Sequence, residues 1–297
     1  MNSWGHVLIR VLIYLVAAPL LGGLLAGIDR RISARMQSRV GPPLLQPFYD
    51  VAKLWSKEPI VVRRSQNFYI IFFFLLTVFT GGLFFCGSDL LLVFFALTLS
   101  GIFFILGAYK ASSPYSFVGA SRELIQVMAY EPIVLLTAVG LYMATGTFQV
   151  DAIWGGAFHP LKALPGAHIP VLLLPGVFVA LLYAMEIKFR KSPFDLAASH
   201  HAHQELVRGI TTEFSGPTLA MIEVAHWYEN VMLLGWIFLF FGSCWPAGLI
   251  ACAVTYFLLL VVDNVCARVK WPVMLRSAWG MTLVFGFGNI VVLSLLK

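Results

Sequence analysis

Residues that can bind and release protons gather in one stretch of the chain, residues 186–229. The stretch holds six of the 14 acidic residues and four of the seven histidines, although long apolar segments flank it. The acidic residues are Glu186, Asp195, Glu205, Glu213, Glu223 and Glu229. Removing an ionised carboxylate from water is costly, so such groups beside apolar segments are solvated, paired or functional.

The clearest pattern in this stretch is a polar stripe within the apolar segment 219–242. Glu223, His226 and Asn230 follow a helical spacing of i, i+3 and i+7, with Glu229 close by. A helix in lipid must turn such a stripe toward protein or water. The stripe therefore predicts one wall of a hydrated path.

A second candidate is Glu131, about two and a half turns into the apolar segment 123–145 and directly before Pro132. A glutamate that snorkels or pairs near the membrane surface is the simpler interpretation. A carboxylate at this depth beside a proline, which frees backbone carbonyls, favours a functional role. Arg122, Gln126 and Tyr130 share one face of the same helix.

The run His200, His201 and His203 invites a metal interpretation. Its spacing does not match a helical zinc motif, because no carboxylate joins it on one face. The four cysteines are scattered without a C-x-x-C pair, so we expect no metal or iron–sulfur site in this chain. Asp195 is expected to cap a short helix over 196–208. Asp263 is expected to pair with Arg268 for structural reasons.

Composition defines the class of protein. The chain is 60% hydrophobic and 11% charged, with a mean hydropathy of +0.86, whereas soluble domains are about 25% charged. We predict an all-α, polytopic membrane protein that forms a single membrane domain over 1–297, with a retained first span rather than a cleaved signal peptide. Eight stretches are long and apolar enough to span: 6–27, 66–87, 89–109, 123–145, 169–187, 219–242, 246–265 and 274–296.

The basic residues predict the topology. All but Arg10, Lys162 and Lys297 of the 20 basic residues fall in or beside four connections, 29–64, 110–122, 188–218 and 266–273. The positive-inside rule places these loops in the cytoplasm and both termini outside. The same asymmetry explains the net charge of +6 without nucleic acid.

Loop 29–64 contains a predicted amphipathic helix. Its apolar residues recur at helical spacing: Leu45, Phe48, Val51, Ala52 and Trp55. Such a helix lies on the membrane as an anchor or docks a soluble subunit, and both interpretations stay open. Arginines clustered just before it suit carboxylates on a partner.

Several motifs together resemble one family. The sequence reads ARMQSRVGP at 34–42, LLQPFYDVAKLWSKE at 44–58, RELIQVMAYE at 122–131, SPFDLA at 192–197, QELVRGITTEFSG at 204–216 and KWP at 270–272. In order and spacing this resembles the membrane subunit of respiratory complex I that carries the quinone chamber. It also resembles the membrane anchors of energy-converting [NiFe] hydrogenases and formate hydrogenlyase.

The resemblance implies a coupling role in a multisubunit complex of a prokaryotic cytoplasmic (inner) membrane. It implies no cofactor in this chain, and places a [NiFe] centre and iron–sulfur clusters in partners: hydrogenase-like large and small subunits and an iron–sulfur subunit. An antiporter-like membrane subunit and ferredoxin, as electron donor, complete the implied set. Carried over by motif, the proton path comprises Glu131, Glu186, Asp195, Glu205, Glu213, Glu223 and Glu229. Arg30, Arg35, Arg39, Gly41 and Pro42 would face the soluble subunits.

Within the family, the run TTEFSGPTLAMIEVAHWYE (211–229) resembles the hydrogenase branch more than a quinone-reducing complex. Between Asp195 and Glu205 the chain is about three residues longer than the family pattern and carries histidines, which argues against a bound quinone. A quinone-site subunit of complex I is the alternative. A stand-alone ion transporter is a second alternative, disfavoured because no internal repeat is visible.

Overall fold

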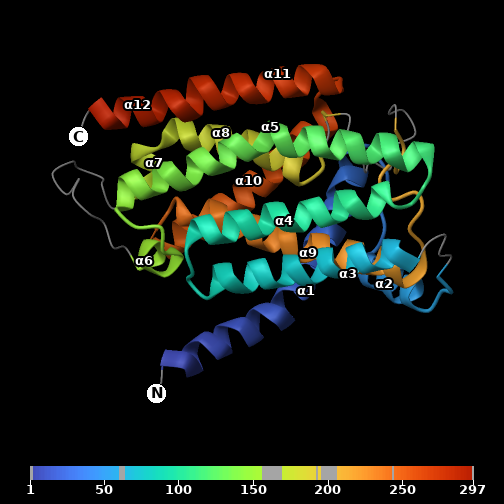
Figure 1. The fold of residues 1–297 in the computed structure, drawn as a ribbon. Coiled ribbons are helices and arrows are strands. Elements are labelled where there is room, and N and C mark those ends of the chain that lie inside the picture. Colours follow the sequence, from blue (N-terminus) through green and yellow to red (C-terminus); the bar gives the residue numbers. More distant parts are fainter. Residues whose placement is uncertain are drawn as a thin grey trace.

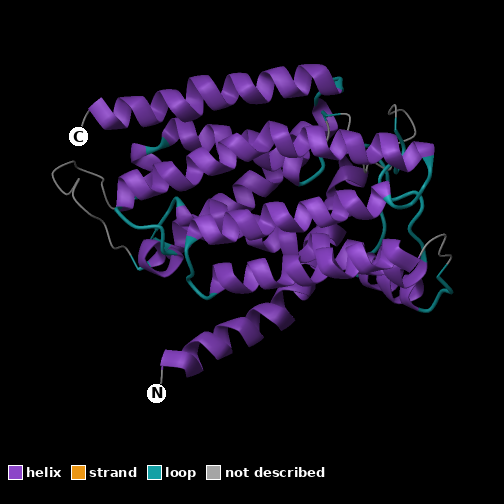
Figure 2. Cartoon of the chain, viewed as in Figure 1, coloured by secondary structure: helices purple, strands orange, loops and turns teal. Residues whose placement is uncertain are grey.

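The computed structural model describes residues 3–59, 64–155, 169–191, 193–194, 206–242 and 244–295. Within these ranges every element is helical, and the extended pairing is limited to two isolated bridges, Asp89–Gln149 and Phe194–Val269 (Figure 2). Lipid offers backbone groups no other partner, so apolar spans must form helices. The predicted all-α class is confirmed.

The predicted spans correspond to helices of unequal character. The helices are α1 (Ser3–Met36), α2 (Gln46–Trp55), α3 (Arg64–Phe85), α4 (Leu90–Tyr109), α5 (Pro114–Thr145), α6 (Val150–Trp154), α7 (Pro170–Leu173), α8 (Pro175–Lys188), α9 (Gly216–Leu239), α10 (Trp245–Val265), α11 (Trp271–Met281) and α12 (Gly288–Leu295), the last two joined by a π-helical turn, η1 (Thr282–Phe287).

Among the described residues, six helices are long and apolar enough to cross a membrane by length and composition. They are α1, α3, α4, α5, α10 and the continuous α11–η1–α12. The other two predicted spans differ for physical reasons. The fifth is broken into α7 and α8, and the sixth, α9, carries the polar stripe of Glu223, His226 and Asn230 with Glu229 beside it, which lowers its hydropathy.

Two helices extend well beyond their apolar stretches. α1 continues from Gly27 to Met36, and α5 begins at Pro114, so the expected loop 110–122 is mostly helical. At 1.5 Å per residue, α1 is about 51 Å long, against about 30 Å for a hydrocarbon core. The charged turns of α1 therefore project beyond the core. Proline fits the first turn of a helix, which explains the early start of α5.

The chain ends and the basic connections lie at opposite ends of the bundle. The N-terminus, α6 and the end of α12 lie at one end, and α2 lies at the other (Figure 1). At the first end, Arg10 of α1 contacts Asp151 of α6 at 2.7 Å. The starts of α5 and α11 lie at the same end as α2 (Figure 1), so the described helix ends beside the predicted cytoplasmic loops share one end of the bundle.

The centre of the bundle is apolar and aromatic. α9 packs against α1, α2, α3 and α10, and its Trp236 is almost fully buried beside Phe84 of α3. α3 and α4 form a hairpin, and Asp89 caps α4 by accepting a hydrogen bond from the Leu91 amide at 2.8 Å. This rigid core holds the polar side chains of α5, α8 and α9 in place.

The break between α7 and α8 is closed by Asn289 of α12. Its Oδ1 accepts hydrogen bonds from the Gly176 and Val177 amides at 2.9 and 3.1 Å, and its Nδ2 donates to the Leu173 carbonyl at 3.2 Å. A helix break leaves backbone groups unsatisfied, and these are costly in an apolar bundle. Asn289 supplies the missing partners and fixes the start of α8.

Glycines on α1 allow the segment before α2 to lie directly on that helix. A Cβ at Gly27 would overlap the Leu44 carbonyl oxygen, and one at Gly23 would overlap the Phe48 ring. Gly41 adopts a left-handed φ of 76° and packs against Ala34. Residues 41–48 therefore run back along α1 and hold α2 against the bundle.

We expect Gly27→Ala to loosen this packing, because the new methyl group meets backbone rather than a flexible side chain. Overpacking of this kind costs about 1–3 kcal/mol. Thermal unfolding and limited proteolysis within 37–58 would measure it. Gly82→Ala is the matched control, since a Cβ at Gly82 has nothing within 4 Å. Equal behaviour of the two variants would contradict the packing argument.

Candidate functional site

A cavity of about 1130 Å³ opens at the α2 end of the bundle. α1, α2, α9, α10 and the segment after α8 contribute its walls. Its charged lining comprises the carboxylates of Asp29, Asp50, Glu223 and Asp263 and the cations of Arg30, Arg39, Lys53, Lys57, Arg190, Lys191 and Arg208. Cations outnumber carboxylates, so the cavity presents a positive surface at the basic end of the molecule.

Lys191 joins three elements at the cavity wall. Its ammonium forms an ion pair with Asp29 of α1 and lies 3.7 Å from the Asp263 carboxylate of α10. The side chains of Lys191 and Asp263 are 11% and 16% exposed, so water screens these contacts only partly. The segment after α8 is thereby tied to α1 and α10.

Arg190 carries the charged network from the cavity into the bundle. It donates to Glu123 of α5 at 3.0 Å and contacts the imidazole of His226 of α9. Its guanidinium also lies over the Phe104 ring, 5.2 Å from the centroid. The backbone of Arg190 has a φ of 56°, an uncommon conformation for a residue with a Cβ. This left-handed turn ends α8 and directs the side chain inward.

The deepest part of the network is a buried ion pair between α8 and α9. Lys188 Nζ lies 2.9 Å from Glu229 Oε1, and the two side chains are 7% and 11% exposed. Glu229 Oε2 lies 3.5 Å from His226 Nδ1, and the Lys188 ammonium lies 4.6 Å from the Tyr130 ring centroid. One continuous set of contacts therefore leads from the cavity to Lys188.

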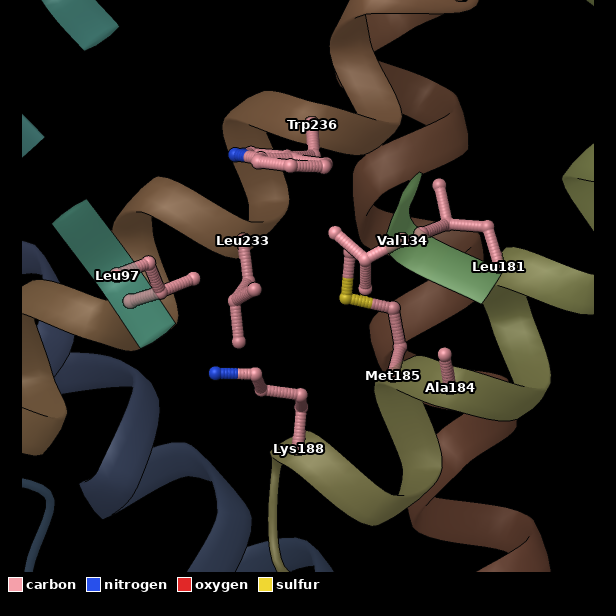
Figure 3. A pocket seen from close by; sticks show the side chains of 8 residues that line it. All are labelled: Leu97, Val134, Leu181, Ala184, Met185, Lys188, Leu233 and Trp236. Atoms are coloured by element: carbon pink, nitrogen blue, oxygen red, sulfur yellow. The ribbon is translucent and has the colours of Figure 1, made fainter. Parts of the chain in front are cut away.

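Lys188 also borders a small void. Figure 3 shows its ammonium extending from α8 toward Leu233 and Leu97, among otherwise apolar side chains. The void measures about 10 Å³, the lower limit for a single water molecule. An ammonium has three donors, so a water here would satisfy one that the carboxylate of Glu229 does not reach.

Three more of the predicted acidic residues lie in the described part of the chain. Glu186 is buried at the inner end of α8, and its Oε1 has no hydrogen-bond partner among the described residues. Glu131 is half-buried beside Tyr130 on α5. Glu213 is half-buried just before α9, where its backbone carbonyl accepts from Gln66 at 3.5 Å. Burying a carboxylate oxygen without a hydrogen-bond partner is costly, which makes Glu186 a candidate proton carrier.

Some predicted residues lie outside the described ranges: Asp195, Glu205 and the histidines at 200, 201 and 203. The expected helix over 196–208 lies largely outside them too. Within the described residues, no group of three histidine, cysteine or carboxylate side chains converges as a metal site. Asp263, expected to pair with Arg268, lies 3.7 Å from the Lys191 ammonium.

Sequence reasoning missed Glu123, Lys188, Arg190 and Lys191 as site residues. The three cations served only as topology markers, although they directly follow Glu186 at the end of an apolar span. Glu123 precedes Gln126 and Tyr130 at i, i+3 and i+7, so its place on their buried face was a readable signal. Helical spacing could not predict the ion-pair partner of Glu123, since Arg190 lies 67 residues away in the sequence.

The predicted interface residues line two hollows of the surface. Arg30 and Arg39 line the cavity, Arg35 lines a second groove with Arg31, and Gly41 and Pro42 border both.

Arg30 pairs with Asp50 of α2 at 2.5 Å. Partial burial raises the pKa of Asp50, but hydrogen bonds from Arg30 and Gln46 outweigh it and lower the pKa below its ordinary value. The ion pair therefore contributes its full stabilisation of α2 at pH values above the ordinary pKa of an aspartate. This stabilisation is lost as the pH falls through the lowered pKa of Asp50.

The fold and site define a polytopic membrane subunit whose charged interior opens at one end. The family model described as NADH dehydrogenase matches residues 9–294. The chain therefore belongs to this family, and the resemblance predicted from the motifs is confirmed.

The curated relatives come from more than one kind of complex. Hydrogenase-4 component C of Escherichia coli is 28% identical, with 93% of this chain and 92% of the relative aligned. Formate hydrogenlyase subunit 4 of the same organism is 29% identical, with 98% of each chain aligned. An NADH-quinone oxidoreductase subunit of Syntrophotalea carbinolica is 27% identical, with 89% of this chain and 88% of the relative aligned.

The fold also matches a chain from the structure of a membrane-bound sulfane sulfur reductase, described as an archaeal respiratory membrane complex. The TM-score is 0.80 at 21% identity, covering 97% of this chain and 99% of the other. At this identity the match concerns the fold alone.

The buried pair should show strong energetic coupling. Lys188→Met or Glu229→Met alone leaves a buried charge without its partner, which costs about 3–5 kcal/mol. The double variant should lose less than the sum of the two, as thermal unfolding in detergent would measure. The exposed pair of Arg10 and Asp151 provides the control cycle, with coupling below about 1 kcal/mol. Additive losses at Lys188 and Glu229 would contradict the assignment.

Proposed function

We propose that this chain is the membrane anchor and coupling subunit of a multisubunit, energy-converting hydrogenase complex. The observation that carries the proposal is the continuous charged network from the cavity, through Arg190 and His226, to Lys188 and Glu229. The relatives named hydrogenase-4 component C and formate hydrogenlyase subunit 4 favour this branch of the family. Electron transfer and hydrogen chemistry take place in partner subunits.

Coupling follows from electrostatics inside the bundle. A [NiFe] centre in a partner subunit would supply the redox chemistry, and the groups facing the cavity would respond to the change in local charge by binding or releasing protons. Arg190 contacts both Glu123 and His226, so its position depends on the charge of each. Charged groups in contact respond to one another, so a change of charge at His226 is felt at Glu229 and, through it, at Lys188. The proposed proton path then continues past Glu131 and Glu186.

The two ends of the charged network suggest where partner subunits would bind. The large and small hydrogenase-like subunits and the iron–sulfur subunit would dock on the cytoplasmic side, around Arg30, Arg39, Gly41 and Pro42 of the cavity wall. An excess of cations there suits acidic partner surfaces. An antiporter-like membrane subunit would respond to the change of charge in the network and move protons or sodium ions across the membrane. Ferredoxin would supply the electrons, and both termini would lie outside the cytoplasm.

The decisive test is the composition of the complex that co-purifies with this chain in mild detergent. We expect nickel, iron–sulfur clusters and hydrogen evolution driven by reduced ferredoxin. A complex without nickel that reduces quinone in an inhibitor-sensitive reaction would overturn the hydrogenase assignment.

The second candidate is the quinone-site membrane subunit of a complex I. The cavity favours it, because about 1130 Å³ exceeds the volume needed for a head group and His226 and Glu223 offer polar contacts in its wall. A bound quinone would accept electrons and protons there. The same purification distinguishes the two candidates, since this one requires quinone reduction and no nickel.

Glu131→Gln and Glu213→Gln should leave assembly intact and lower ion movement per electron transferred. Both side chains are half-buried, so an uncharged isostere fits, but it cannot release a proton. Ion uptake into vesicles, measured beside redox turnover, reports the ratio. Glu58→Gln is the control, since Glu58 is exposed on the same end of the molecule. Wild-type coupling in both test variants would remove these residues from the path.

A further inference from the structure

A second groove, which shares Gly41 and Pro42 with the cavity wall, lies on the outer side of α1, where that helix leaves the apolar core. It measures about 530 Å³ and is lined by Arg31 and Arg35 of α1, residues 40–45 and Tyr49 of α2. We call it the arginine groove. Of the residues predicted to meet soluble subunits, Arg35 lines this groove and does not line the cavity.

The arginine groove continues the lipid-facing side of α1. At 3.6 residues per turn, five residues of α1 fall within about 80° of one another, on a single face. They are Leu20, Leu24, Ile28, Arg31 and Arg35. The first three are apolar and exposed, as expected of a surface that contacts acyl chains. The two arginines follow them immediately, at the depth where the head groups of that leaflet lie.

The walls of the groove combine apolar and cationic surface. Val40, Leu44 and Leu45 are exposed, and so is the ring of Tyr49 on the amphipathic helix α2. Tyrosine is typical of the membrane–water interface, and an amphipathic helix with exposed apolar residues lies in it. Close packing of Gly41 on Arg31 and Ala34 fixes the segment that forms this wall.

Charge complementarity identifies the occupant. Arg31 and Arg35 are exposed, one turn apart, and form no ion pair within the described part of the chain. Arginine binds phosphate through paired N–H donors, and two on one helix face can hold one phosphate between them. The apolar walls beside them require a ligand that also carries acyl chains. We propose that the arginine groove binds an anionic phospholipid of the cytoplasmic leaflet, with its phosphate between Arg31 and Arg35.

The test uses the complex purified in mild detergent, stripped of lipid and titrated with dioleoyl phosphatidylglycerol or dioleoyl phosphatidylcholine, with bound lipid counted by native mass spectrometry. Wild type should prefer phosphatidylglycerol. Arg31→Gln/Arg35→Gln should weaken phosphatidylglycerol binding about 30-fold, since each cation near a membrane surface contributes about fivefold. Phosphatidylcholine binding should stay unchanged. Arg31→Lys/Arg35→Lys keeps both charges and should retain most of the affinity.

Lys270→Gln/Arg276→Gln is the matched control, because it removes two exposed cations from the start of α11. It should bind phosphatidylglycerol as wild type does. Glycerol phosphate, which lacks acyl chains, should not displace the lipid at millimolar concentration. If the control variant lost as much phosphatidylglycerol binding as the test variant, the effect would come from general surface charge. The proposed site would then be wrong. Loss of soluble subunits from Arg31→Gln/Arg35→Gln, with lipid binding intact, would show a protein interface instead.

Discussion

The structure depends on one constraint, the need to pair every charge that the apolar bundle encloses. Lys188 and Arg190 enter the interior at the end of α8, where an unpaired cation would be strongly disfavoured. Glu229 on α9 and Glu123 on α5 meet them at 2.9 and 3.0 Å. These contacts fix how α5, α8 and α9 face one another, so the same pairs that make burial of the charges possible also define the site.

Buried ion pairs fix the arrangement of helices, but they add little to the free energy of unfolding compared with apolar packing. Apolar side chains of similar volume often stabilise an interior at least as well as an ion pair. The five groups in contact, Glu123, Lys188, Arg190, His226 and Glu229, therefore matter less for net stability than for how α5, α8 and α9 face one another. The cavity wall repeats this arrangement, since Lys191 lies between Asp29 and Asp263.

Sequence patterns predicted the elements well and their lateral contacts poorly. Hydropathy located the spans and helical periodicity located α2, because both depend on local sequence. The extra turns of α1 and α5 escaped detection, since charged residues end an apolar run without ending a helix. The pairing of Lys191 with Asp29, across 162 residues, depends on how the helices are arranged around one another, which one sequence does not state. The polar stripe on α9 was recognised because it follows the period of a single helix.

The contact between Asn289 and the break before α8 has a consequence for biosynthesis. α8 is made about a hundred residues before Asn289, so its first amides and the Leu173 carbonyl lack these partners while the rest of the chain is being inserted. During this time Asn289 does not yet hold the first turn of α8, the helix that carries the charged end. These three hydrogen bonds can therefore form only after α12 has been made, and until then the start of α8 lacks the partners that hold it in the finished bundle.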